Sequence, residues 1–307
     1  MMITGFIIGW KRIKNDTNDV NIKVSVIISI RNEGANIKKL VQSLRNQNYN
    51  KDLYDVIIVN DHSDDNSWEL LCNEKLNWPH LQLLDMDVNE YGKKKALSKA
   101  INFSNSEVIL TSDADCVFSP EWIKSMTSCF INDNINLASG PVSFNPQSTF
   151  FNQIQTLEFL SLIASGAAAI GLNQPIFCNG ANLAYRRKVF LEVNNYDDND
   201  IASGDDVFLL HMVKKLGPGS ILFIKKFEAI VLTDSITTFR QFINQRIRWV
   251  SKSSSYKDAY TIYTSILVFL VNSLLILLLF LSFYDNDFIN VFTFFILIKF
   301  VLDLIFF

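Results

Sequence analysis

Glycine, proline and cysteine are scarce in this chain of 307 residues, which contains 11 glycines, 6 prolines and 4 cysteines. No Gly/Ser linker, low-complexity segment or internal repeat divides the sequence, which favours one large domain. The cysteines show no C-x-x-C spacing, so neither a zinc site nor a disulfide framework is indicated, and free thiols suit a reducing compartment. Excess positive charge is also lacking: the net charge is −3, so nucleic acid is not an expected partner.

Long apolar runs, in contrast, are present near the C-terminus of a chain that is 49% hydrophobic. Ile262–Phe283 and Phe288–Phe307 are each long enough to cross a bilayer, and the short turn between them predicts a transmembrane hairpin. Buried helices of a soluble core are the alternative. Lys299 and Asp303 lie four positions apart and can pair on one helix face, which lowers their cost in lipid. No polar flank follows the second run, so we expect the native chain to extend beyond Phe307.

Basic residues lie on one side of these runs. Arg246, Arg248, Lys252 and Lys257 precede the first run, whereas the turn after it carries only acids. By the positive-inside rule the preceding domain lies in the cytoplasm, so we expect an integral membrane protein, of a bacterial inner membrane. Near the N-terminus, Ile3–Trp10 is too short to span a bilayer and lacks a signal-peptide cleavage region. An interfacial anchor and the tail of a longer helix remain the two interpretations.

Between these regions the pattern alternates strands with helices. Apolar runs predict strands at Val24–Ile30, Val56–Asn60, Leu81–Leu84 and Val108–Thr111. Helices are predicted around Ile37–Leu44, Ser67–Asn73 and Lys93–Ile101, and another is expected to open at Pro120. This alternation predicts an α/β fold with a mainly parallel sheet. Phe150–Ile170 reads as one long helix, and the polar residues within it favour a packed or interfacial position over a membrane span.

Asp113 and Asp115 directly follow the fourth predicted strand. The carboxyl ends of strands in an open α/β sheet are where ligands bind, and residues i and i+2 of an extended chain point the same way. Two carboxylates facing one site are hard oxygen ligands, which suit Mg²⁺ or Mn²⁺ carrying a diphosphate. A surface turn with two solvated acids is the alternative for so short a motif.

Polar groups also follow the other three strands. Asn32 and Glu33 follow the first, Asp61 follows the second, and Gly92–Lys93 follows the third and opens a helix. A helix N-terminus with adjacent lysines favours phosphate. Each group taken singly is equally consistent with a solvated loop, but four successive strands ending this way indicate a site for a nucleoside diphosphate.

Two later segments add candidate groups. Asp205 and Asp206 precede an apolar helical run, where they act either as a general base or as a plain helix cap. Gln245, Arg248 and Trp249 lie on an amphipathic helix before the first apolar run. These side chains suit hydrogen bonding, phosphate binding and stacking on a sugar ring, although an interfacial anchor with snorkelling arginines has the same composition.

Together these segments resemble the membrane-associated family-two glycosyltransferases, which have the GT-A fold of nucleotide-diphospho-sugar transferases. The resemblance runs from Val24 to Trp249 and rests on motifs in family order: the Val24–Glu33 strand and loop, Asn60–Ser63, Gly92–Lys93, Asp113–Asp115, Gly180–Arg187, Gly204–Asp206 and the Q-x-x-R-W of Gln245–Trp249. Asn60 replaces the first acid of one motif, and Asp205 replaces the commoner Glu of another. The implied divisions are an N-terminal anchor or truncated helix at 1–20, a Rossmann-like GT-A catalytic domain at 21–235, an interfacial helix at 236–260 and a transmembrane hairpin at 261–307.

The resemblance implies a role for each matching residue. Asp61 hydrogen-bonds uracil of a UDP-sugar, Asn32, Glu33 and Lys93 help to hold the nucleotide, and Arg248 neutralises the diphosphate. Asp115 binds Mn²⁺ or Mg²⁺, with Asp113 at the metal or the ribose. Asp206 is the general base, with Asp205 as the second choice, and Asn182, Gln245 and Trp249 contact the acceptor. The implied activity is metal-dependent, inverting transfer of a sugar from a nucleotide sugar to a lipid-linked or saccharide acceptor at the membrane.

Three rival hypotheses remain at this stage. A processive polysaccharide synthase shares these motifs, and Q-x-x-R-W favours it, whereas the small number of membrane helices favours single transfer. A nucleic-acid polymerase palm shares Gly204–Asp206 as a G-D-D turn, but there the turn joins two strands. An inactive membrane scaffold is the third, and the intact acids argue against it.

Overall fold

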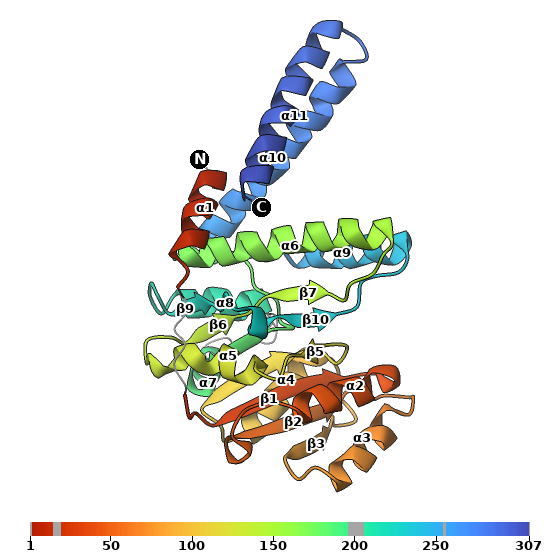
Figure 1. Cartoon of the computed structure of the whole chain (residues 1–307), viewed down its shortest axis with the longest axis vertical. Coiled ribbons are helices and arrows are strands. Elements are labelled where there is room, and N and C mark those ends of the chain that lie inside the picture. The colour runs from red at the N-terminus through yellow and green to blue at the C-terminus, as the bar shows by residue number, and fades with distance from the viewer. Residues whose placement is uncertain (1, 15–19, 196–205, 254–255, 307) are drawn as a thin grey trace.

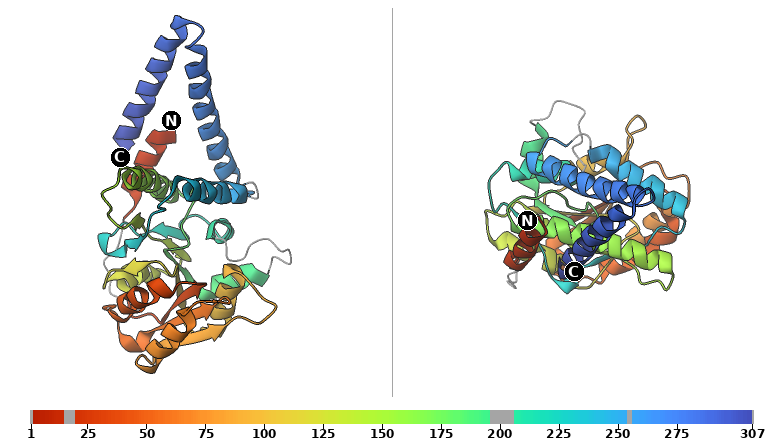
Figure 2. Two further views of the ribbon diagram at one scale, coloured as in Figure 1. Left: turned by 90° about the vertical axis from the view of Figure 1, so that its right-hand side faces the viewer. Right: turned by 90° about the horizontal axis from the view of Figure 1, so that it is seen from above.

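The computed structural model describes residues 2–14, 20–195, 206–253 and 256–306. Its α/β body lies at one end of the molecule, a layer of long helices covers one side of it, and a helical hairpin projects from that layer (Figures 1 and 2). The long axis therefore runs from a mixed α/β region to a purely helical one.

The main sheet has seven strands in the order β3-β2-β1-β4-β8-β6-β9. The strands are β1 Val24–Ile30, β2 Tyr54–Asn60, β3 Leu81–Asp85, β4 Val108–Ser112, β6 Leu137–Ser139, β8 Leu183–Arg186 and β9 Ile221–Phe223. β1 to β4 pair in parallel, and β8 runs antiparallel to both neighbours. The predicted mainly parallel α/β sheet is confirmed, and the central strands are buried on both faces, which explains their continuous apolar runs.

Helices connect these strands and cover the sheet. They are α2 Gly34–Arg45, α3 Ser67–Leu76, α4 Lys93–Phe103, α5 Trp122–Thr127, α7 Arg187–Asn195 and α8 Asp206–Lys214. The prediction that Pro120 opens a helix is wrong by two residues. The Trp122 N–H donates to the carbonyl of Ser119 at 3.1 Å, so Pro120 occupies the second position of a turn that its fixed φ favours, and α5 begins after it.

A second, three-stranded sheet was not predicted. It has the order β5-β10-β7, made of Val117–Phe118, Val231–Thr233 and Val142–Phe144. Strands of two or three residues are too short to show an alternating pattern, which is why the sequence gives no sign of them. The sheet matters because β10 pairs with β5 immediately after the Asp113–Asp115 segment, in the register Leu232 to Val117.

The helical layer contains α6, α9 and α1. α6 spans Phe150–Gly171, α9 spans Phe239–Ser253 and α1 spans Met2–Arg12. α1 docks on α6 so closely that a Cβ on Gly9 would lie 2.0 Å from the carbonyl oxygen of Ala168. The N-terminal stretch is therefore a short helix packed on α6, with its buried Phe6 in the contact.

The hairpin consists of α10, Ala259–Leu281, and α11, Asn286–Phe306. By length and composition, α6, α10 and α11 are the three helices among the described residues that are able to cross a membrane. Lys299 and Asp303 form an ion pair on α11, as their spacing predicts. Nearly half of the most apolar part of α6 is buried against the protein, whereas no residue in that part of α11 is buried.

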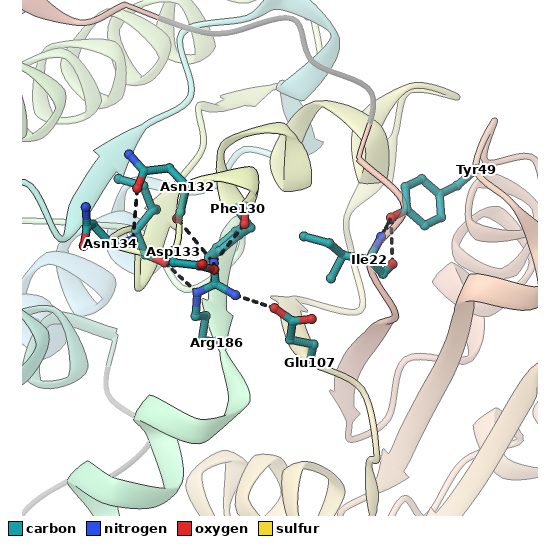
Figure 3. Close-up of polar contacts among 9 residues, drawn as sticks. Ile22, Tyr49, Glu107, Phe130, Asn132, Asp133, Asn134 and Arg186 are labelled. Atoms are coloured by element: carbon teal, nitrogen blue, oxygen red, sulfur yellow. Dashed lines mark hydrogen bonds and ion pairs between the residues drawn. The ribbon is translucent and has the colours of Figure 1, made fainter.

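Arg186, at the end of β8, joins several segments of the core and does not line the cavity described below (Figure 3). Its buried guanidinium donates to the carbonyls of Ile135 at 3.0 Å and Phe130 at 2.8 Å. It also pairs with Glu107 and, at 3.3 Å, with Asp133. Arg186 belongs to the Gly180–Arg187 motif of the family resemblance. In the structure its side chain joins β8 to the segments that contain Glu107, Phe130 and Asp133.

Candidate active site

One cavity of about 910 Å³ opens at the carboxyl ends of the central strands. It gathers predicted site residues from widely separated parts of the chain: Lys93, Asp113, Asp115, Asp206, Gln245, Arg248 and Trp249. The strands β1 to β4 end on the same side because they are parallel, and α8 and α9 close the cavity opposite them. Acids and bases from both halves of the sequence thus face a single space.

Lys93 and Asp113 form an ion pair at the edge of this cavity, with both side chains half-buried. Lys93 is the first residue of α4, directly after Gly92, whose φ of 98° is readily adopted only by glycine. Burial acts to lower the pKa of Lys93, but the carboxylates of Asp113 and Asp206 outweigh it and hold that pKa above its usual value. A cation is therefore fixed beside the first acid of the D-x-D.

Asp115 lies deeper than Asp113 and has a partner that the sequence did not reveal. The Thr233 hydroxyl, at the end of β10, donates to Asp115 Oδ2 at 2.8 Å. Burial raises the pKa of Asp115, the hydrogen bond from Thr233 opposes this, and the charge of Asp113 raises the pKa again. Only the unpredicted pairing of β5 with β10 brings Thr233 to this carboxylate.

Asn32 and Glu33 adjoin the cavity without lining it. Burial raises the pKa of Glu33, a hydrogen bond from Asn36 opposes it, and the nearby charges of Asp115 and Asp113 raise it further. Asn32 has a left-handed φ of 57°, and its side-chain oxygen accepts the N–H of Asp64 at 2.8 Å. These contacts tie the loop after β1 to the loop after β2.

Asp61 is buried behind the wall of the cavity. Both of its carboxylate oxygens accept the backbone N–H of Gly92, at 3.0 and 3.2 Å. His62 next to it stacks on Tyr91, with ring centroids 4.3 Å apart. Asp61 therefore positions the segment that presents Lys93, and its predicted contact with uracil stays a prediction.

The residues at the D-x-D fit a divalent cation that arrives with a diphosphate. Among the described residues there is no group of three or more His, Cys, Asp or Glu side chains able to hold a metal by itself. Mg²⁺-type ions, however, commonly take one or two carboxylates and complete their shell with substrate phosphates and water. Burial, and after it the charge of Asp113, raise the pKa of Asp115, and a bound cation would offset both effects by stabilising the carboxylate.

Asp206 begins α8 and faces the same cavity. Its Oδ2 accepts the backbone N–H of Gly180 at 2.6 Å, and a Cβ on Gly180 would lie only 3.2 Å from that oxygen. The carboxylate is thus held in place by a backbone group that glycine allows to approach. Asp205, the second choice for this role, lies outside the described residues. Asp206 begins a helix, whereas the G-D-D turn of a polymerase palm leads into a second strand, so the described residues argue against that rival.

The α9 side chains divide into fixed and unfixed groups. Arg246 forms a two-point ion pair with Glu158 of α6 and stacks over the ring of Trp249, 4.2 Å from its centroid. Trp249 also contacts Phe159, so it packs between helices as well as lining the cavity. The side chain of Arg248 lines the cavity and makes no hydrogen bond or ion pair within the described parts of the chain.

The predicted acceptor contact of Asn182 is not supported by its position, which is fully buried. Its amide nitrogen donates to the carbonyls of Pro141 at 2.7 Å and Ala229 at 2.8 Å, and its amide oxygen accepts from the Trp122 indole at 3.0 Å. Both N–H groups and the oxygen of the Asn182 amide are bonded to the protein, so Asn182 joins the two sheets and does not line the cavity.

The C-terminal end of α8, the helix that Asp206 begins, is bonded to the hairpin. Lys214, the last residue of α8, pairs at 2.7 Å with Asp258, the N-cap of α10. Asp258 Oδ1 accepts the N–H and hydroxyl of Thr261, and that hydroxyl is 3.1 Å from His211 Nε2. Burial acts to raise the pKa of Asp258, but its bonds to Lys214 and Thr261 hold that pKa below its usual value.

The amino-acid sequence of the chain matches the model of one protein family. The sequence model of glycosyl transferase family 2 matches residues 25–193, more than half of the chain. Glycosyltransferase AglE of Haloferax volcanii is 25% identical over 182 residues, which cover 59% of this chain and 58% of that protein. Poly-beta-1,6-N-acetyl-D-glucosamine synthase of Staphylococcus epidermidis is 26% identical over 183 residues, which cover 59% of this chain and 43% of that protein. The chain thus spans about half the length of these relatives.

A solved structure shares the fold at low sequence identity. The mannosyltransferase PcManGT from Pyrobaculum calidifontis, in complex with GDP-Man and Mn²⁺, superposes with a TM-score of 0.58 at 16% identity, covering 80% of this chain and 69% of that one. This similarity supports the fold.

Proposed function

The chain belongs to glycosyl transferase family 2, and from that premise we propose that it transfers a sugar from a nucleotide diphosphate sugar to an acceptor hydroxyl at a membrane surface. The observation that carries this proposal is the shared cavity. Asp113 and Asp115 reach it from the end of β4 and Lys93 from the start of α4, whereas Asp206 and Arg248 reach it from α8 and α9. One side suits the leaving diphosphate and the other suits the incoming hydroxyl.

The acceptor oxygen attacks the anomeric carbon while the bond from that carbon to the diphosphate oxygen breaks. The acceptor proton passes to the Asp206 carboxylate, and the bonding electron pair leaves with the nucleoside diphosphate. The Gly180 N–H holds Asp206 in position for this step. A single displacement inverts the anomeric configuration, and a positioned base contributes about 10²–10⁴-fold in rate.

The leaving group requires positive charge. Arg248, which has no protein partner among the described residues, and Lys93 at the N-terminus of α4 supply it. Asp115 and Asp113 would hold Mn²⁺ or Mg²⁺, which when bound neutralises charge that develops on the diphosphate. Complexes of two family-like structures contain Mn²⁺ together with GDP-Man or UDP, which supports a divalent cation here.

We also propose that α6 and α9 lie on the membrane surface, with α10 and α11 inserted and the α/β body in the cytoplasm. The exposed apolar residues of α6 and α9 support this position, because they recur on one face of each helix: Phe150, Ile154 and Leu157 on α6, and Phe239, Ile243, Ile247 and Val250 on α9. Both helices lie on the hairpin side of the body (Figures 1 and 2).

A processive polysaccharide synthase is the second candidate. The similarity to poly-beta-1,6-N-acetyl-D-glucosamine synthase over the catalytic region favours it. Product length on a defined acceptor separates the two proposals, because single transfer adds one sugar and processive synthesis adds many.

The test is a screen of UDP- and GDP-sugars for metal-dependent release of nucleoside diphosphate by the full chain in detergent. We expect one donor to be turned over with Mn²⁺ or Mg²⁺ and not after chelation. Asp115→Ala should lower the affinity for that donor more than 100-fold, since it removes a direct metal ligand whose supporting groups alone are worth about 10–100-fold. Asp52→Ala, on the exposed 3₁₀ turn Lys51–Leu53, is the matched control. Turnover that is unchanged by chelation and by Asp115→Ala would refute the metal role.

A further inference from the structure

The cavity does not end at the catalytic residues. It continues between α6, α8 and the first turns of α10, where Leu162, Phe177 and Val207 replace the acids in its wall. Its total volume of about 910 Å³ is near the upper end of the range for pockets that hold one small ligand, about 300–1,000 Å³. The apolar end thus offers room beside a bound donor.

Among the described residues, one hydroxyl in this apolar end has no partner. Thr264 is only 8% exposed and lines the cavity, and its Oγ1 makes no hydrogen bond within the part of the chain that the structure describes. The neighbouring Ser265 shows the usual alternative, since its hydroxyl donates to the carbonyl of Thr261 at 2.9 Å. A buried hydroxyl without a partner is costly, so the site is built for a ligand that supplies a hydrogen-bond acceptor or donor.

One arginine of the cavity wall is not used by the described parts of the protein. Arg246 is already paired with Glu158, but Arg248 projects into the cavity with no carboxylate on it among the described residues. Arginine binds phosphate through several parallel hydrogen bonds. An acceptor with a phosphate linker would therefore find a donor in Thr264 and a charge in Arg248.

The same helix, α10, connects this end of the cavity to the bilayer. Thr264 is turned into the cavity, whereas Ile266, Phe269 and Leu270 on the following turns are more than half exposed. These apolar residues belong to a helix that is long and apolar enough to span a membrane. A hydrocarbon chain thus meets apolar side chains in the cavity wall, at Leu162 and Phe177, and on the exposed face of α10.

We propose that this end of the cavity binds the lipid part of the acceptor: a long hydrocarbon chain joined through phosphate to the saccharide that carries the attacking hydroxyl. This inference rests on the proposed transfer activity and selects a lipid-linked acceptor over a free polysaccharide. The linker phosphate binds Thr264 Oγ1 and shares Arg248 with the leaving diphosphate, because the guanidinium has five N–H donors. The hydrocarbon chain leaves toward the bilayer beside α10, and the saccharide reaches Asp206.

The test is photolabelling of the full chain in nanodiscs with a long-chain alkyl phosphate that carries a diazirine in its chain. Cross-linked peptides identified by mass spectrometry should include Leu162 on α6 and Phe177. Thr264→Val keeps the shape of the side chain and removes the hydroxyl, so cavity labelling should fall about fivefold, the value of one hydrogen bond. Ser165→Phe fills the cavity from α6 and should abolish that labelling.

Thr293→Val on α11 is the matched control, since that hydroxyl bonds to the carbonyl of Ile289 on the same helix. Labelling of the exposed faces of α10 and α11 is the internal standard, and retained binding of nucleoside diphosphate with Mn²⁺ shows that each variant is folded. Labelling confined to those exposed faces would overturn the lipid site and leave the proposed transfer activity intact. Cavity labelling in a protein that turns over no sugar nucleotide would instead overturn the transfer activity and, with it, the acceptor role.

Discussion

The two ends of the cavity are built in different ways. At the sheet end, each polar group follows a strand and is fixed by a close neighbour: Asp113 by Lys93, Asp115 by Thr233 and Asp61 by Gly92. At the helical end, the wall comes from α6, α8, α9 and α10, and the groups that face the cavity include an arginine and a threonine with no partner among the described residues. The polar groups of the sheet end are held by the protein, whereas those two groups of the helical end are available to what binds there.

Arg186 and Arg248 differ in the same way as the two ends of the cavity. Arg186 is buried and donates to protein carbonyls and carboxylates, so its charge stabilises the fold (Figure 3). Arg248 is exposed to the cavity and contributes no such bond to the described structure. A charge that the fold does not use is available to a substrate, and this distinction is open to experiment.

The largest effect that would sharpen this contrast is expected at Asp206. Asp206→Asn preserves the shape and removes the base, so turnover should fall about 10²–10⁴-fold, while donor affinity changes by less than about twofold, within the usual scatter of small surface effects. Single-turnover kinetics together with calorimetry of donor binding measure the two quantities. Equal turnover in Asp206→Asn and wild type would transfer the role to another acid, and Asp205→Asn is the next variant to measure.

The next largest effect compares the two arginines. Arg248→Met should lower turnover by about 10²–10³-fold, as for the loss of one transition-state donor, and leave the melting temperature unchanged. Arg186→Met should do the opposite: it removes several buried hydrogen bonds, costs about 3 kcal/mol of stability and lowers the melting temperature by roughly 6–10 °C. Thermal melting and initial rates of both variants in the same detergent are the measurements. If the melting temperature of Arg248→Met falls by as much as that of Arg186→Met, the claim that Arg248 binds substrate and does not stabilise the fold is wrong.

The smallest effect concerns Thr233 and pH. Thr233→Val removes the bond that lowers the pKa of Asp115, so this already raised pKa should rise further. A proton competes with the metal for the carboxylate, so Mn²⁺ binding is present above the pKa of Asp115 and is lost as pH falls through it. The valine variant should therefore bind Mn²⁺ about 10-fold more weakly and lose it at a higher pH than wild type. Thr233→Ser should restore both, and failure of serine to do so would indicate a packing role only.

Sequence reasoning succeeded at the sheet end for a physical reason. β1 and β4 are long, apolar and followed at once by polar groups, so pattern alone locates Glu33 after β1 and Asp113 and Asp115 after β4. Thr233 was missed because β10 has three residues and its neighbour β5 has two, which is below the length at which alternation can be read. Asn182 was misjudged for a related reason: a polar residue beside a glycine-containing loop resembles a ligand, and only packing shows that its amide is already bonded.

The bond between Lys214 and Asp258 has a practical consequence for any assay. A transmembrane helix tilts to match the thickness of its bilayer, and α10 carries Asp258 as its N-cap. An ion pair of 2.7 Å has little room to stretch, so in the proposed membrane arrangement a tilt of α10 must either turn α8, the helix that starts at Asp206, or break the pair. We therefore expect the acyl-chain length of the lipid to affect the position of the Asp206 carboxylate. Rates should be compared only between samples in lipids of the same chain length.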